Sequence, residues 1–306
     1  MTVRVAIAPH PAPDYAREAA SEAGATVVDL PEAEALLWTA PAGPELLAET
    51  LRGPRSALRW VHLRWAGIED FARLGLLDPD LVWTCGKGVF AEPVAEHALA
   101  LALAGLRDLP QRVRASSWGA QSGVSLFGRD VLILGGGGIS EALVELLRPF
   151  RTTITVVRRS RRPMRWVHRV VGPDRLDQML AEADVVFVAW ALTPETEAAL
   201  DGERLRLLRP GAWLVNVGRG RHVVTEDLVE VLREGRIGGA ALDVTDPEPL
   251  PDGHPLWTLP NVVITPHTAN TYEMAVPLMK QRIVDNLRRF AAGKPLIGLV
   301  DPASGY

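Results

Sequence analysis

Short apolar runs alternate with amphipathic segments along most of this chain. In the first 90 residues, the runs predict strands that begin at Val3, Thr26, Ala35, Leu58 and Leu81. No hairpin-type turn joins consecutive runs, and strands that alternate with helical segments are typical of a parallel sheet covered by helices. The pattern therefore predicts a small α/β domain at the start of the chain.

An Ala/Leu-rich helix is expected next, from Pro93 to about Asp108, with Pro110 ending it. The segment is apolar on nearly every face, and such helices are buried. We expect it to lie between domains or between subunits.

A second series of apolar runs predicts six more strands, which begin at Val131, Ile154, Val185, Trp213, Gly239 and Val262. Helical segments are expected between them over residues 173–182, 196–208 and 226–234. Together with the first series, this pattern predicts an α/β fold of two Rossmann-like or flavodoxin-like, doubly wound parallel-sheet domains separated by a cleft.

A last helix is expected after Thr271 and is expected to end at Gly293. Its apolar residues recur every three or four positions, at Val276, Met279, Ile283, Leu287 and Phe290. Pro277 should either kink this helix or delay its start. Because the helix follows the last strand of the second sheet, we expect it to return to the first domain.

The stretch VLILGGGGIS, residues 131–140, runs from an apolar strand through four glycines into a helix. Gly135 and Gly137 take the first two positions of a G-x-G-x-x-G turn, in which bare backbone lets phosphate oxygens approach N–H groups. Ser140 takes the third position, where glycine or alanine fits more easily. With Gly138 and Ile139 opening the helix, the turn predicts a dinucleotide site. A glycine loop without a ligand is the alternative for the turn alone.

Ligands of open parallel sheets bind at the carboxyl ends of the strands. Three side chains near these ends, Arg219, Glu248 and His267, are the groups that hydride addition to a 2-oxoacid needs. Imidazolium can protonate the developing alkoxide, a neighbouring carboxylate raises the pKa of that imidazole, and a guanidinium can hold the substrate carboxylate. Each residue alone is more often an ordinary surface group. The other six histidines are expected to lie inside elements (His62, His97) or in loops and edges (His10, His168, His222, His254).

The segment VVRRSRRP follows the second strand of the glycine-turn series, where NAD-binding sheets usually offer a carboxylate to the ribose. This segment carries three arginines in place of the carboxylate: Arg158, Arg159 and Arg161. Their charges would suit the 2′-phosphate of NADP. NADP is therefore the expected coenzyme, with NAD possible. A solvated basic loop is the alternative, and with Arg162, Arg165 and Arg169 it could contact nucleic acid.

Composition and charge argue against several classes of protein and of binding site. The net charge of −4 over 306 residues argues against broad nucleic-acid binding. The single cysteine, Cys85, has no disulfide partner, and the chain has no metal-ligand spacing. The N-terminus lacks a signal-peptide pattern, and the apolar runs are shorter than the about 20 residues that span a bilayer. A cytoplasmic protein without a membrane segment is expected.

Four segments resemble signatures of the D-isomer-specific 2-hydroxyacid dehydrogenases: LTPET at 192–196, NVGRG at 216–220, ALDVTDPEPLP at 241–251 and TPHTA at 265–269. The resemblance implies that Arg219, Glu248 and His267 are the catalytic residues. It also implies coenzyme contacts, beyond the glycine turn and the arginines, by Leu192, Thr196, Val217, Gly218, Asp243 and Ala269. Substrate contacts are implied for Trp65, Lys87, Gly88 and Val89. Ser140 and Ala191 depart from the family pattern.

The same resemblance implies the domain arrangement. Residues 1–100 would form the first part of a substrate domain, residues 101–270 the NAD(P)-binding Rossmann domain, and residues 271–306 the helix that returns to the substrate domain. The resemblance is greatest to the glyoxylate/hydroxypyruvate reductase branch. It implies an NADPH-dependent reductase of small 2-oxoacids that forms a homodimer. A nucleotide-binding regulator without turnover, or a dehydrogenase of formate or a phosphorylated acid, remains an alternative.

Overall fold

The computed structural model describes residues 2–40 and 43–302, which form two compact α/β units. One unit combines the described residues up to Phe90 with those from Thr271 onward, and the other is the continuous stretch Ala91–Asn270. The division after Phe90 lies ten residues before the one drawn from the sequence at residue 100. It falls there because helix α4 (Ala91–Leu106) belongs as a whole to the second unit.

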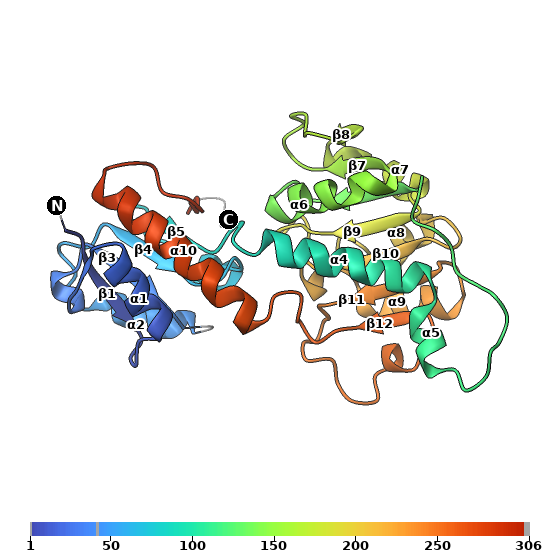
Figure 1. The fold of residues 1–306 in the computed structure, drawn as a ribbon, viewed down its shortest axis with the longest axis horizontal. Coiled ribbons are helices and arrows are strands. Elements are labelled where there is room, and N and C mark those ends of the chain that lie inside the picture. The colour runs from blue at the N-terminus through green and yellow to red at the C-terminus, as the bar shows by residue number, and fades with distance from the viewer. Residues whose placement is uncertain (1, 41–42, 303–306) are drawn as a thin grey trace. The chain divides into compact units, whose positions relative to one another are not determined.

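The first unit contains a five-stranded parallel sheet with the order β2-β1-β3-β4-β5 (Figure 1). Its strands are β1 (Arg4–Ala8), β2 (Thr26–Val27), β3 (Ala35–Trp38), β4 (Trp60–Leu63) and β5 (Val82–Thr84). Its helices are α1 (Asp14–Glu22), α2 (Pro44–Arg52), α3 (Glu69–Arg73), α10 (Tyr272–Ala291) and the short η1 (Leu30–Glu32). All five expected strands are therefore present. Every residue of β3 and β4 is buried, as expected for inner strands with both faces covered.

Helix α10 packs against α1 (Figure 1). It begins directly after Thr271, whose hydroxyl accepts the backbone N–H of Met274 at 3.5 Å. Pro277 lies inside this helix and does not delay its start. The C-terminal segment then reaches β5, where Thr84 pairs with Leu299. This segment thus adds a single bridge to the edge strand of the first sheet.

The second unit contains a seven-stranded parallel sheet with the order β12-β11-β10-β9-β6-β7-β8. Its strands are β6 (Asp130–Leu134), β7 (Thr153–Val157), β8 (Arg169–Val171), β9 (Val185–Val188), β10 (Trp213–Asn216), β11 (Gly239–Leu242) and β12 (Val262–Ile264). The helices are α4, α5 (Leu109–Arg114), α6 (Gly138–Leu147), α7 (Leu176–Glu182), α8 (Gly202–Leu207), α9 (Thr225–Arg233), η2 (Arg148–Phe150), η3 (Pro173–Arg175), η4 (Gly220–His222) and η5 (Pro255–Trp257). The strand order reverses at β6, so the turn after β6 lies at a switch point of the sheet.

Three sequence expectations for this unit are wrong. The sheet has seven strands and not the expected six, because the pattern did not predict the edge strand β8. The helix expected over residues 196–208 begins only at Gly202, because Leu200 instead forms a bridge with Val223. Pro110 does not end the Ala/Leu-rich helix, which stops at Leu106, but lies in the first turn of α5.

Helix α4 is buried along one side within the second unit, and its expected burial between domains or between subunits stays a prediction. Its inner face packs on α6 and β10, and Glu96 and Ala100 on its outer face are exposed. Gly105 makes the close packing possible, because a Cβ there would lie 2.3 Å from the Trp213 ring. The neighbouring Leu214 points to the other face of the sheet and packs in the core with α7, α8 and α9.

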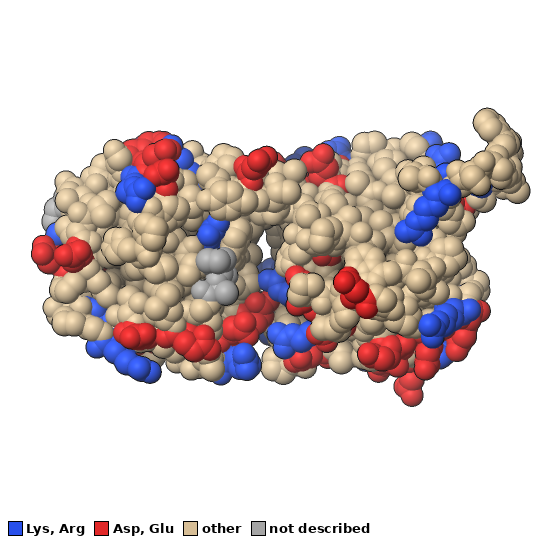
Figure 2. Space-filling model, turned by 90° about the horizontal axis from the view of Figure 1, so that it is seen from below, with Lys and Arg blue, Asp and Glu red and all other residues tan. Residues whose placement is uncertain are grey.

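Charged side chains of both signs are interspersed on the face shown in Figure 2. Surface ion pairs among the described residues include that of Arg206 with Glu234 at 2.9 Å. No helix in the described part of the chain is long and apolar enough to cross a membrane.

Candidate active site

The adjacent strands β10, β11 and β12 bring the three expected catalytic residues to one edge of the second sheet. Arg219 comes three residues after β10, and His267 comes three residues after β12. Glu248 lies in the turn that follows β11. Because parallel strands end at the same edge, their following loops are neighbours.

His267 and Glu248 are in direct contact. Nδ1 of His267 lies 2.6 Å from Oε1 of Glu248, with 53% and 41% of the two side chains exposed. The hydrogen bond to Glu248 raises the pKa of His267, while partial burial and the charge of Arg219 oppose that rise. The carboxylate therefore favours the imidazolium form.

The backbone of His267 is held in the left-handed region, with φ of 50°. A non-glycine residue is strained there and needs support from its surroundings. The His267 N–H donates to the carbonyl of Asp243 at 2.9 Å, which supplies part of this support.

The buried carboxylate of Asp243 organises the loop around His267. It accepts hydrogen bonds from the Thr265 hydroxyl at 2.6 Å and from the backbone N–H groups of Thr268 and Ala269 at 2.9 and 3.0 Å. His97 Nε2 from α4 lies 3.3 Å away. Burial would raise the pKa of Asp243, but these hydrogen bonds outweigh it and lower the pKa to about 2. Asp243 is only 2% exposed, so its carboxylate stabilises the loop from the interior of the protein.

The turn that carries Arg219 is closed by Asn216 and His222. Asn216 donates from Nδ2 to the Arg219 carbonyl at 2.9 Å and accepts the Gly218 N–H at 3.1 Å. His222 Nδ1 accepts the Arg219 N–H at 3.1 Å. These bonds fix the backbone from which the guanidinium extends.

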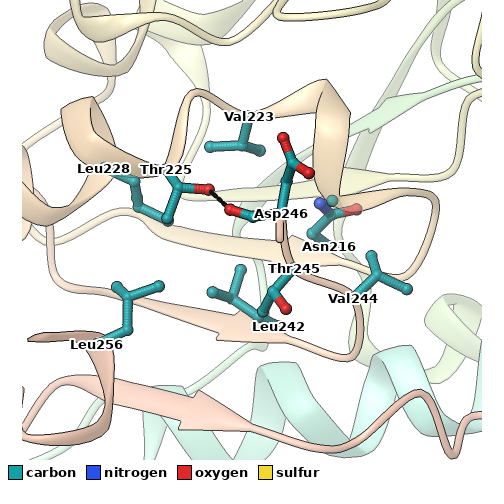
Figure 3. A pocket seen from close by; sticks show the side chains of 10 residues that line it. Asn216, Val223, Thr225, Leu228, Leu242, Val244, Thr245, Asp246 and Leu256 are labelled. Carbon is teal, nitrogen blue, oxygen red and sulfur yellow. Dashed lines mark hydrogen bonds between the residues drawn. The ribbon is translucent and has the colours of Figure 1, made fainter. Parts of the chain in front are cut away.

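Direct backbone packing joins the Arg219 turn to the turn that leads to Glu248. A Cβ at Gly220 would lie 1.9 Å from the carbonyl oxygen of Thr245, so only glycine fits there. The Thr225 hydroxyl donates to the Asp246 carbonyl at 2.6 Å, as the dashed line in Figure 3 shows. The small pocket beside this bond is lined mainly by apolar side chains: Val223, Leu228, Leu242, Val244 and Leu256. The Arg219 turn and the turn that leads to Glu248 are thus packed directly against each other.

The glycine turn after β6 is built as a dinucleotide turn requires. Gly135 has φ of 120°, and a Cβ there would lie 2.5 Å from the Ala189 carbonyl oxygen. The space that a Cβ at Gly137 would fill is open, and α6 begins at Gly138, followed by half-buried Ile139. Ser140 is fully buried, and its hydroxyl has no hydrogen-bond partner. The turn fits a pyrophosphate at the start of α6, and Ser140 is an imperfect substitute for the third glycine.

The three expected phosphate-binding arginines differ in their surroundings. The side chain of Arg158 lies over the glycine turn, with Cδ 2.6 Å from the position of a Cβ on Gly136. Arg159 is exposed. Arg161 pairs with Asp174 at 2.5 Å. Arg158 is therefore better placed than Arg161 to receive a new anion.

The remaining expected coenzyme residues lie in the loops of the same edge. In the LTPET loop, the Thr196 hydroxyl donates to the Ala191 carbonyl at 2.8 Å and accepts the Thr193 N–H at 2.9 Å. Leu192, Val217, Gly218 and Ala269 are buried. These residues shape the loops that border the sheet edge.

The expected substrate residues Trp65, Lys87, Gly88 and Val89 lie in the first unit, after β4 and β5. The Trp65 ring packs on Phe90 with centroids 5.6 Å apart. The Lys87 carbonyl accepts from Arg282 Nη1 of α10 at 2.9 Å. Gly88 is exposed with φ of 79°, which favours glycine.

The structure shows no group of three or more His, Cys, Asp or Glu side chains suited to a metal ion among residues 2–40 and 43–302. The Cys85 thiol is buried, which raises its pKa.

A family model described as "D-isomer specific 2-hydroxyacid dehydrogenase, NAD binding domain" matches residues 97–269. The chain belongs to this family. It is 36% identical to a glyoxylate reductase from Aeropyrum pernix over 248 residues, which are 76% of this chain and 72% of that one.

Solved structures of this dehydrogenase family agree with the fold. A D-isomer specific 2-hydroxyacid dehydrogenase from Xanthobacter autotrophicus, in complex with NADPH and MES, is 28% identical, covers 100% of both chains and has a TM-score of 0.85. An NADPH-dependent glyoxylate/hydroxypyruvate reductase from Sinorhizobium meliloti, in complex with NADP and malonate, is 27% identical with a TM-score of 0.76, covering 99% of this chain and 98% of that one. The chain is thus an enzyme of the NAD(P)-dependent D-2-hydroxyacid dehydrogenase family. Its α/β fold contains two parallel β-sheets.

Sequence reasoning about this dehydrogenase missed two histidines near the site. His222 was set aside as a loop residue, yet it is fully buried and holds Arg219. His97 was set aside as a residue inside a helix, yet its Nε2 lies 3.0 Å from the Thr265 hydroxyl. The short GRGRH sequence was a signal for His222, since it places an imidazole three residues from the arginine. No signal in the sequence connected His97 to residues so far along the chain.

Proposed function

We propose that this enzyme reduces a small 2-oxoacid of the glyoxylate or hydroxypyruvate type to the D-2-hydroxy acid, with a preference for NADPH. The observation that carries the proposal is the 2.6 Å contact between His267 Nδ1 and Glu248 Oε1. A histidine held in this way is oriented and kept protonated, as a proton donor to an alkoxide requires.

Each residue of the triad has a separate task in this proposal. Glu248 holds Nδ1 of His267, so Nε2 is the nitrogen that gives its proton to the substrate oxygen. Arg219 holds the substrate carboxylate, because guanidinium is always charged and forms paired hydrogen bonds with carboxylates. The bound nicotinamide coenzyme would supply the hydride.

The coenzyme would be held by the glycine turn and the arginines after β7. Gly135, Gly137, Gly138 and Ile139 form the turn, whose open space at Gly137 suits a phosphate. Arg158 and Arg159 would bind a 2′-phosphate, and Arg161 would join them only by loosening its pair with Asp174. NADPH in the related Xanthobacter structure supports the preference.

A homodimer is part of the proposal. The stretch from α5 to β6 carries large apolar side chains that are mostly exposed, with Trp118 94% and Val113 84% exposed. Monomeric proteins seldom leave such groups together in water. Light scattering should therefore give about twice the mass of one chain.

Absorbance at 340 nm tests the activity. NADPH and NADH are each mixed with glyoxylate, hydroxypyruvate, pyruvate and phenylpyruvate, and oxidation is followed in turn. The proposal expects glyoxylate or hydroxypyruvate to be reduced, and NADPH to give the higher kcat/KM. Tight NADPH binding without oxidation by any 2-oxoacid would instead indicate a nucleotide-binding regulator, in line with the buried hydroxyl of Ser140 in the coenzyme turn.

A further inference from the structure

A histidine of helix α4 reaches the loop that carries His267. Helix α4 packs beside strands β11 and β12 of the second unit (Figure 1). From this helix, Nε2 of His97 lies 3.0 Å from the hydroxyl oxygen of Thr265 and 3.3 Å from Oδ1 of Asp243. Only 24% of the His97 side chain is exposed. The imidazole is therefore mostly covered, at the carboxyl ends of these two strands.

The bonding pattern shows which atom of this group donates. The Thr265 hydroxyl donates its single proton to Oδ1 of Asp243 at 2.6 Å. Toward His97 the same oxygen can therefore only accept. Nε2 of His97 must carry a proton, and this N–H is shared between the Thr265 hydroxyl and the Asp243 carboxylate. The hydrogen bonds thus run from His97 to the buried carboxylate.

Asp243 connects His97 to the His267 loop. Its carboxylate accepts the backbone N–H groups of Thr268 and Ala269, and its backbone carbonyl accepts the N–H of His267 at 2.9 Å. Burial would raise the pKa of Asp243, and the hydrogen bond from His97 contributes most to lowering it to about 2. His97 therefore helps to keep the charge to which the loop N–H groups are bonded.

The loop needs this support because His267 is strained. Its φ of 50° lies in a region that residues other than glycine seldom occupy. Such a conformation persists only where the surrounding structure holds it. If the hydrogen bonds to the loop were weakened, the backbone could relax and turn the imidazole away from Glu248.

We propose that His97 is a positioning residue for the proton donor His267. Through Thr265 and Asp243, it holds the loop in the conformation in which the His267 imidazole meets Glu248. This inference rests on the proposed function, in which His267 protonates the substrate oxygen. His97 itself gives no proton to the substrate, because its Nε2–H is already donated within the protein.

Steady-state kinetics on the full-length enzyme test this role with NADPH and glyoxylate. His97→Leu should lower kcat about tenfold, because a hydrogen bond to a buried charged group is lost. KM for both substrates should stay close to wild type, because Arg219 and the glycine turn are unaltered. An unchanged kcat would overturn the inference. A rise in the KM for NADPH alone would also overturn it, because it would assign His97 to coenzyme binding.

Three further variants separate the hydrogen bond from simple packing. The amide nitrogen of glutamine can reach the position of Nε2, so His97→Gln should recover most of kcat. Asparagine is too short, so His97→Asn should behave like His97→Leu. Thr265→Val, which removes the hydroxyl between His97 and Asp243, should show the same loss. Equal kcat values for His97→Gln and His97→Asn would overturn the inference, even if His97→Leu does not fold.

His168→Leu is the matched control. His168 also forms a hydrogen bond in the second unit, where its Nδ1 accepts the Ile154 N–H at 3.0 Å. It directly precedes β8, at the opposite edge of the sheet from β12. Its replacement should lower Tm without changing kcat. A loss of kcat as large as that of His97→Leu would overturn the inference, because any lost histidine bond would then slow the enzyme.

A double-mutant cycle tests whether His97 acts through His267. In His267→Ala the proton donor is absent, so adding His97→Leu should lower kcat no further. A second loss of the same size as that of His97→Leu alone would overturn the inference and leave the proposed reaction standing.

Amide hydrogen exchange separates this inference from the proposed function, because it requires no turnover. The N–H groups of His267, Thr268 and Ala269 should exchange faster in His97→Leu than in the wild type, and His97→Gln should restore slow exchange. That result in a protein that reduces no 2-oxoacid would leave the support of the loop by His97 standing and refute the proposed reaction. Unchanged exchange in an active enzyme would do the reverse.

Discussion

The imidazole of His222 joins two loops of the candidate active site. Its Nδ1 accepts the backbone N–H of Arg219 at 3.1 Å, and its Nε2 lies 3.4 Å from the carbonyl oxygen of Ala191. Burial lowers the pKa of His222 to about 4, so the ring is neutral in the neutral pH range. With Nδ1 accepting, the single proton is on Nε2 and points toward Ala191. His222 is therefore a positioning residue for Arg219.

Replacing His222 with Leu should lower kcat/KM for the 2-oxoacid about tenfold or more, because the partly buried Arg219 N–H loses its acceptor at a cost of roughly 1–3 kcal/mol. His222→Asn keeps an acceptor close to the position of Nδ1 and should retain much more activity. Kinetics of both variants, with circular dichroism to confirm folding, check this expectation. Equal activity of the two variants would show that the hydrogen bond to Arg219 is unimportant.

Replacing His267 with Ala should reduce kcat by roughly two to four powers of ten, the usual size of a general acid contribution. Binding of NADPH, measured by its fluorescence, should remain close to wild type, because the glycine turn is unaltered. Retention of wild-type turnover would rule out His267 as the proton donor.

Replacing Glu248 with Gln should shift the pH dependence of kcat/KM for reduction. Glu248 raises the pKa of His267, so the imidazole remains protonated to higher pH in the wild type. Without that carboxylate the pKa falls, and the alkaline loss of activity should begin at lower pH. A pH profile measured with both enzymes tests the shift, and identical alkaline limbs would contradict the role of Glu248.

Replacing Arg159 with Ala should raise the KM for NADPH far more than the KM for NADH. One charge-assisted contact is worth roughly 1.5–3 kcal/mol, which corresponds to about a 10- to 100-fold change. Arg161→Ala is the matched control, because Arg161 already pairs with Asp174 and should matter less. Similar KM increases for both coenzymes in Arg159→Ala would argue against recognition of a 2′-phosphate.

Replacing Ser140 with Ala should stabilise the protein by about 1 kcal/mol, because a buried hydroxyl without a partner is removed and the packing is otherwise kept. Urea unfolding of both proteins measures the difference. A lower unfolding free energy in Ser140→Ala would mean that the hydroxyl has a favourable partner after all.

The hydrophobic pattern was enough to predict most of the fold. The inner strand β9 is a continuous apolar run, and β10 is apolar up to Asn216, because helices cover both faces of the sheet. The edge strand β8 was missed because it has three residues, and one of them, Arg169, is exposed. The turns at 196–200 were assigned to a helix because their pairing with residue 223 is a long-range contact that local periodicity does not carry.

Part of the candidate site could be predicted from the order of strands along the chain. The positions of the predicted strand ends were enough to select Arg219, Glu248 and His267, because adjacent parallel strands end at one edge of the sheet. The supporting residues were not predictable in this way. His97 reaches Thr265 only through the packing of α4 on the sheet.

The return of α10 to α1 affects the order in which the two units can be completed on the ribosome. The stretch Ala91–Asn270 is continuous and is fully synthesised before α10 exists. The first unit also includes α10 and the segment in which Leu299 pairs with Thr84, so it is complete only after these residues are synthesised. During translation, the stretch Ala91–Asn270 can thus finish folding before the first unit does.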